Sequence, residues 1–91
     1  MHPALVALLR AGIGITAEEL VGGLPIPIPV SSSAISDVSW TVDGELRLTI
    51  KGDRYVYYAV PVSTVIGLAT AASPTRYFSL NIRESFGYDA L

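Results

Sequence analysis

The residues of this sequence best suited to binding a ligand lie between positions 73 and 83. Arg76 and Arg83 flank Tyr77 in a segment that opens with a Ser-Pro pair, which is typical of a helix start. Guanidinium groups can hold phosphates while a tyrosine ring stacks on a base, so this surface is suited to RNA or a nucleotide. The candidate ligand-binding residues are Ser73, Arg76, Tyr77, Asn81 and Arg83.

A purely structural interpretation of the same segment is also open. Ser73 would then cap the helix, and Tyr77 would pack beneath a sheet. The two arginines would pair with Glu84 and Asp89 on the surface. The sequence leaves both interpretations standing.

A second candidate surface arises from RYVYYAVP, residues 54–61. Successive side chains of an extended chain point to opposite faces, which separates Tyr55 and Tyr57 from the residues between them. We assign these two tyrosines to the core, with their hydroxyls at the rim of a pocket. The opposite face carries an apolar strip that needs a cover, either the N-terminal arm or a partner. The candidate partner-binding residues are Val56, Tyr58, Val60 and Arg47.

The sequence offers little for catalysis. His2 is the only histidine, and a chain terminus does not hold a general base in place. The chain has no cysteine, and the serines at 31–33 lack a base to activate them. No spacing resembles a metal site or a phosphate-binding loop. We therefore expect a non-enzyme with no catalytic residue, no metal and no cofactor.

Composition narrows the class of protein further. Of 91 residues, 51% are hydrophobic and 15% charged, too apolar for disorder and apolar enough to suggest a surface that meets a partner. The net charge of −2 argues against a general nucleic-acid footprint. The apolar run 4–9 ends at Arg10, too short for a membrane span or a secretion signal. Together with the missing cysteines, this predicts a soluble cytoplasmic protein.

The first 29 residues are predicted to form an N-terminal arm. Pro3 and Gly12 bracket a predicted helix over residues 3–11. Thr16 and Glu19 form a capping box for a second short helix that the glycines at 22–23 end. The segment LPIPIPV, residues 24–30, is predicted to be extended chain or a sheet edge, since proline excludes a helix and a central strand. We divide the chain into this arm with its Pro-rich linker, residues 1–29, and a domain of residues 30–91.

Within the domain, period-two alternation from Ile35 predicts three strands. A three-residue loop with a left-handed Gly44 keeps the apolar faces together and pairs Trp40 with Leu46. Residues 52–53 read as a two-residue hairpin, which sets Leu48 opposite Tyr57.

Apolar residues three and four apart after Pro61 predict a helix, and Ser73-Pro74 predicts the start of another. The expected fold is α+β: a three-stranded antiparallel β-meander followed by two helices packed on its Tyr/Trp face, preceded by the short helical arm.

A set of short motifs runs through these elements: Ser32-Ser33-x-Ile35, Val38-x-Trp40, Leu46-x-Leu48-x-Ile50, Tyr55-x-Tyr57-Tyr58-x-Val60-Pro61, Ala72-Ser73, Arg76-Tyr77-Phe78 and Ile82-Arg83. This pattern resembles the KTSC domain, named for the C-terminus of some lysyl-tRNA synthetases and found in small stand-alone bacterial and phage proteins. The resemblance spans about Val30 to Tyr88. The sequence differs from the family pattern at Ser79, where the family has Asn, at Thr75, where Gly is common, and at Trp40, where Tyr is more usual.

We expect a non-catalytic small binding module that acts through protein–protein contacts, as a bacterial or phage regulatory or accessory protein. Its partner would be an unidentified protein or a second copy of the chain. The alternative is an RNA- or nucleotide-binding module, which the resemblance implies through the association with a tRNA enzyme. An acidic pI of about 5.1 counts against RNA.

Overall fold

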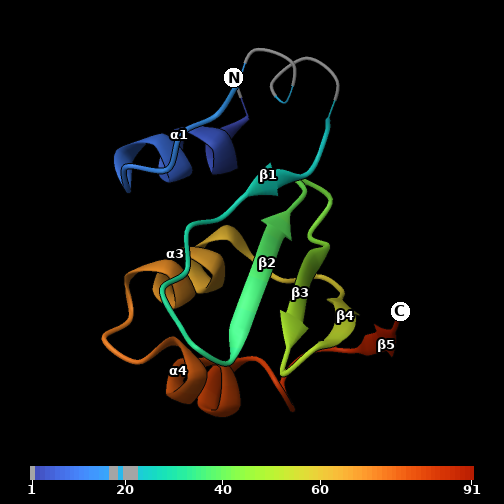
Figure 1. Cartoon of the computed structure of the whole chain (residues 1–91). Coiled ribbons are helices and arrows are strands. Elements are labelled where there is room, and N and C mark those ends of the chain that lie inside the picture. Colours follow the sequence, from blue (N-terminus) through green and yellow to red (C-terminus); the bar gives the residue numbers. More distant parts are fainter. Residues whose placement is uncertain (1, 17–18, 20–22) are drawn as a thin grey trace.

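A computed structural model describes residues 2–16, 19 and 23–91 of the chain. A single antiparallel sheet has the strand order β1-β2-β3-β4-β5, with β1 and β5 at opposite edges (Figure 1). The predicted α+β class is confirmed, but the prediction of three strands is wrong, because the sheet formed by the described residues has five. The elements are α1 (Pro3–Arg10), β1 (Ile26–Pro27), β2 (Ile35–Trp40), β3 (Leu46–Ile50), β4 (Asp53–Tyr57), α3 (Val62–Thr70), α4 (Pro74–Asn81) and β5 (Tyr88–Ala90).

The two additional strands are the short edge strands, and β1 lies in residues 24–30, for which a sheet edge was one of the two predicted conformations. β1 lies within the proline-rich linker and pairs with β2, setting Ile26 opposite Trp40. Pro27 is tolerated there because an edge strand leaves one row of backbone groups unpaired. β5 follows α4 and returns to pair with β4, setting Tyr88 opposite Tyr57. Strands of two and three residues carry too little alternation to be recognised from sequence.

The loop between β2 and β3 follows the prediction. Gly44 has φ of +94°, and Trp40 lies opposite Leu46. β2 also contains a bulge between Ser36 and Ser39, where Asp37 takes φ of +51°. The extra residue allows the buried side chains at both ends of β2 to face the same core.

The predicted register of the β3–β4 hairpin is wrong by two residues. The turn residues are Lys51 and Gly52, with φ of +49° and +88°, and Leu48 faces Tyr55 rather than Tyr57. Positive φ at both central positions is the signature of a type I′ turn, whose twist suits a two-residue hairpin. A shift of two keeps each side chain on its predicted face, so the assignment of Tyr55 and Tyr57 to one face was unaffected.

The N-terminal arm shares the hydrophobic core of the domain. Gly12, with φ of +84°, ends α1, and the amide of Ile13 donates to the carbonyl of Leu8 at 3.0 Å, a Schellman motif. Leu8 and Ile13 are both buried in the cluster that contains the strand residues. α1 therefore packs against α3 as part of the same layer.

The predicted capping box is present, since the Thr16 amide donates to Glu19 Oε1 at 2.7 Å and the Glu19 amide donates to Thr16 Oγ1 at 3.2 Å. The rest of the predicted second helix, including Gly22, lies outside the described residues.

Both predicted C-terminal helices are present, and they contribute buried side chains to the core. Val65 and Leu68 of α3 and Phe78 of α4 pack with Trp40 and Tyr57. The Ser73 hydroxyl accepts a hydrogen bond from the Arg76 amide, and Pro74 occupies the first turn of α4. No helix among the described residues has the length and hydropathy needed to cross a membrane.

Candidate binding site

A cavity of about 550 Å³ lies between the β3–β4 hairpin and α4. Side chains from β4 and β5 form one wall of it, and the end of α4 forms another. Its lining residues combine aromatic, hydroxyl and charged side chains: Ala34, Ile35, Ile50, Lys51, Asp53, Tyr55, Tyr57, Thr75, Phe78, Ser79, Arg83, Glu84 and Tyr88.

Three tyrosines and a phenylalanine form the aromatic wall of the cavity. Tyr57 stacks on Tyr88 with ring centroids 5.2 Å apart, because the β4–β5 register sets these residues opposite each other. Tyr55 meets the edge of Tyr88 at 5.9 Å, and Tyr57 meets Phe78 at 5.5 Å. Period-two alternation places Tyr55 and Tyr57 on one face, so the strands themselves assemble this wall.

The hydroxyl of Tyr57 lies in an unusual electrostatic setting. Burial raises its pKa, and the neighbouring hydroxyls of Tyr88 and Tyr55 raise it further, whereas the charge of Arg83 lowers it. Arg83 and the two tyrosines therefore shift the pKa of the same phenol group, that of Tyr57, in opposite directions. The sequence-based expectation of tyrosine hydroxyls at a pocket rim agrees with the position of Tyr55 and Tyr57 on the cavity wall.

This pKa shift predicts a specific alkaline instability. Since the folded state holds the Tyr57 proton more tightly than the unfolded state does, the stabilising contribution is complete below about pH 10 and is lost as pH rises through the folded pKa. The free energy of unfolding should therefore fall more steeply as the pH rises above about 10 in wild type than in Tyr57→Phe. Urea unfolding followed by circular dichroism would measure both slopes, and equal slopes would contradict the prediction.

The structure does not bring the five predicted ligand-binding residues into one site. Arg83 is the one that lines the cavity. Ser73 caps α4, and the Asn81 side chain donates to the carbonyl of Tyr77 at 3.1 Å. Arg76 is exposed, while the Tyr77 ring lies against α3. The helix cap and the packed tyrosine agree with the structural interpretation of these two residues.

The candidate partner-binding residues do not all lie on one face of the sheet. Val60 is buried in the hydrophobic core, so its assignment to the outer face is wrong. Val56 does lie on the outer face, between Arg47 and Asp89 of the neighbouring strands, but it is buried. Tyr58 remains exposed.

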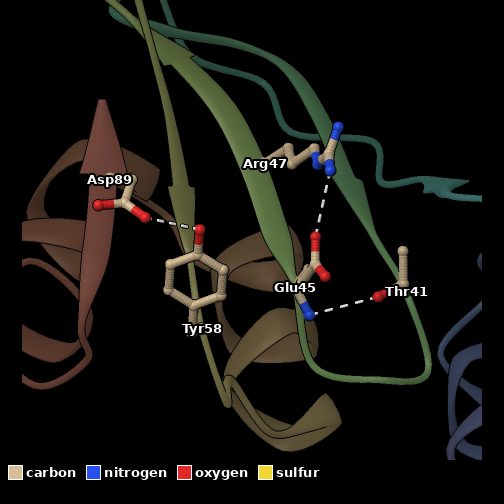
Figure 2. Close-up of polar contacts among 5 residues, drawn as sticks. All are labelled: Thr41, Glu45, Arg47, Tyr58 and Asp89. Carbon is tan, nitrogen blue, oxygen red and sulfur yellow. Dashed lines mark hydrogen bonds and ion pairs between the residues drawn. The ribbon is translucent and has the colours of Figure 1, made fainter. Parts of the chain in front are cut away.

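Polar contacts dominate the outer face where Tyr58 and Arg47 lie (Figure 2). The Tyr58 hydroxyl donates to Asp89 Oδ2 at 2.8 Å, a bond that raises the pKa of Tyr58. Arg47 of β3 pairs at 3.2 Å with Glu45, the residue just before that strand. The bond between Tyr58 and Asp89 links β5 to the residue that follows β4.

The free edge of β5 is the second feature of this region. The Tyr58 amide donates to Gly87 at 2.9 Å, and the Leu91 amide donates to Arg54 at 2.8 Å. Backbone groups alternate in direction along an antiparallel strand, so those of Tyr88 and Ala90 point away from β4. All three residues of β5 are exposed. The strand therefore presents unpaired backbone donors and acceptors directly beside the aromatic cavity.

Sequence reasoning missed Tyr88 as a cavity residue because β5 was not predicted. It also left out Lys51, since the hairpin turn was placed one residue too late. Ser79 and Thr75 were noted only as departures from a family pattern. The available signal was their spacing: positions 75, 79 and 83 are four apart, which puts the first two on one face of α4.

Comparison with known proteins supports the pattern of residues described above. The family model of the KTSC domain matches residues 31–86. No curated protein and no solved structure matches the chain. Because the matched segment covers more than half of the 91 residues, the chain belongs to the KTSC domain family.

Proposed function

We propose that this chain is a non-catalytic binding module that recognises another protein through the free edge of β5. The observation that carries this proposal is the outward direction of the backbone groups of Tyr88 and Ala90. An extended segment of a partner can add to such an edge as a further strand, with main-chain hydrogen bonds supplying affinity. The side chains Tyr88 and Leu91 are 54% and 63% exposed and add apolar surface beside the edge.

The two edges of the sheet differ in a way that supports β5 as the binding edge. β1 at the opposite edge lies among Pro25, Pro27 and Pro29, and proline lacks the amide that an added strand would need. β5 contains no proline. The asymmetry blocks sheet extension at one edge and leaves it open at the other.

Charge favours a different protein over a second copy as the occupant. A second copy paired symmetrically on β5 would set Tyr88 opposite Ala90 and Asp89 opposite its own equivalent. Two carboxylates directly opposite are destabilising. If an extended segment of a different protein placed lysine or arginine opposite Asp89, the two side chains would attract each other. We therefore expect a partner strand with alternating side chains and a basic residue at this position.

Ala90→Pro tests the edge selectively. The Ala90 amide points away from β4, so proline removes a donor to the partner and none to the domain's own ladder. In a selection of displayed random peptides on the wild-type protein, extended peptides with a basic residue should emerge and bind Ala90→Pro at least about tenfold more weakly. Fluorescence anisotropy with labelled peptides would measure the difference.

Ala90→Ser is the matched control, because serine keeps the amide while changing the side chain. Its affinity for the selected peptides should match that of wild type. Binders that tolerate Ala90→Pro would argue against the edge, and sedimentation as a dimer that this substitution dissociates would identify a second copy as the occupant.

RNA or nucleotide binding is less well supported by the geometry. It would draw on Arg76, Tyr77 and Arg83 together, yet the Tyr77 ring packs on α3 and Arg83 faces the cavity. Salt-sensitive binding of a labelled single-stranded RNA, lost in an Arg76→Gln, Arg83→Gln double variant, would favour this alternative over the protein-binding proposal.

A further inference from the structure

We propose that the cavity between the β3–β4 hairpin and α4 binds an oxyanion, a carboxylate or a phosphate, carried by a small ligand with an apolar body. Tyr88 of β5 contributes to both proposals, but this inference concerns its hydroxyl and the other side chains of the cavity, whereas hydrogen bonding at the β5 edge uses the backbone groups of Tyr88 and Ala90.

The cavity holds hydrogen-bond donors that the described residues leave unused. Tyr55, Tyr57 and Tyr88 all line the cavity. Within the described part of the chain, no side-chain hydrogen bond involves any of their hydroxyls. The Tyr57 residue is only 3% exposed, but its hydroxyl is not among the buried unpaired side-chain atoms of the described residues, so it opens to the cavity and is free to donate there. A ligand that supplies an acceptor would satisfy it.

Charged side chains of both signs line the cavity. Lys51 and Arg83 lie there with Asp53 and Glu84, so the cavity as a whole is not basic. Arg83 shares the lining with the three tyrosines. Burial raises the pKa of Tyr57 and the charge of Arg83 lowers it, which agrees with a guanidinium near this hydroxyl. This end of the cavity therefore combines a guanidinium with phenol donors, which suits a negatively charged acceptor.

The rest of the lining and the size of the cavity suit a small ligand with an apolar body. Ile35, Ile50 and Phe78 provide apolar surface beside the aromatic wall. A volume of about 550 Å³ falls within the range of small-molecule sites, roughly 300–1,000 Å³. The nearby hydroxyls of Thr75 and Ser79 are already engaged, the first with Ser32 at 2.9 Å and the second with the Thr75 carbonyl at 3.1 Å. Among the uncharged hydroxyls of the lining, those of the three tyrosines are therefore the ones left free to donate.

Three closely matched probes test the proposal. 4-Hydroxyphenylacetate and phenyl phosphate carry the two kinds of oxyanion on an aromatic body, and 4-hydroxyphenylacetamide keeps the shape of the first without its charge. Each would be titrated to millimolar concentration into ¹⁵N-labelled protein, with amide resonances followed by NMR. We expect at least one acid to shift the amides of the cavity residues and the amide probe to bind roughly tenfold more weakly or not at all.

Arg83→Gln and Tyr57→Phe supply the residue-level test. Each substitution should weaken binding of the acid probe roughly tenfold, whereas Arg76→Gln, which replaces an exposed arginine of α4, should leave that binding unchanged. The dispersion of the NMR spectrum reports whether each variant is folded. Ala90→Pro should bind the probes as wild type does, which separates this inference from the proposed function.

Each outcome bears on the inference. Preference for the carboxylate or for the phosphate would identify the source of the oxyanion. Equal binding of acid and amide, unchanged affinity in Arg83→Gln, or no shift of cavity amides by either acid would overturn the proposal.

Discussion

Trp40→Ala is expected to lower the free energy of unfolding by about 3–5 kcal/mol. Trp40 is 3% exposed and lies between Ile26 of β1 and Leu46 of β3, both fully buried. Its indole Nε1 donates to the carbonyl of Val60 at 2.9 Å, which ties the segment after β4 to the centre of the sheet. Alanine would leave a large cavity and an unpaired buried carbonyl at once. For a domain with total stability of about 5–15 kcal/mol, this loss is severe.

Trp40→Phe separates the two contributions. It keeps an aromatic ring in the core but removes the donor to Val60, so we expect a smaller loss of about 1–3 kcal/mol. Urea unfolding at 25 °C should be followed by far-ultraviolet circular dichroism, because the substitutions remove the only tryptophan fluorophore. A loss below about 1 kcal/mol in Trp40→Ala would contradict the position assigned to this residue.

Gly67→Ala is expected to destabilise the protein by about 1–3 kcal/mol, although alanine is the better helix former. Gly67 lies inside α3, and a Cβ there would lie 2.8 Å from Cε2 of Tyr77 and still closer to its hydroxyl. Because ring atoms as well as the hydroxyl are involved, the whole side chain would have to leave its place between the helices. The apolar contact that Tyr77 makes with the core would then be lost.

Removing the tyrosine ring should reverse the sign of this effect. In a Tyr77→Ala background the clash is gone, so Gly67→Ala should stabilise the protein by about 1 kcal/mol through helix propensity. The double-mutant cycle therefore predicts a large coupling between residues 67 and 77. Additive effects of the two substitutions would show that Tyr77 does not lie against Gly67, and would return Tyr77 to the surface as a candidate ligand contact.

The sequence was sufficient to predict the parts of the fold that local chemistry determines. Proline and serine signals located α3 and α4, and Gly44 together with the apolar alternation set Trp40 opposite Leu46. The register of the next hairpin failed for a physical reason. A shift of two residues keeps every side chain on the same face, so the hydrophobic pattern cannot distinguish Leu48 opposite Tyr55 from Leu48 opposite Tyr57.

The candidate site was predictable only in fragments. Tyr55 and Tyr57 could be assigned to one face and Arg83 named as a ligand contact, but their meeting at one cavity depends on tertiary packing. Tyr88 enters the site because β5, a strand of three residues that follows α4 in the chain, pairs with β4. So short a strand is stabilised by its neighbours rather than by its own sequence. The free edge, which carries the proposed function, was for the same reason not assignable from the sequence.

Amide hydrogen exchange at Tyr88 and Ala90 is the most direct test of protein binding through the β5 edge. It should be measured by NMR with and without a peptide selected on the wild-type protein. The amides of these two residues point away from β4, so they should exchange rapidly in the free protein and slowly in the complex, whereas that of Leu91 is already bonded to Arg54. Slowed exchange at both positions is the result we predict. Peptide binding that leaves both amides in rapid exchange would contradict it.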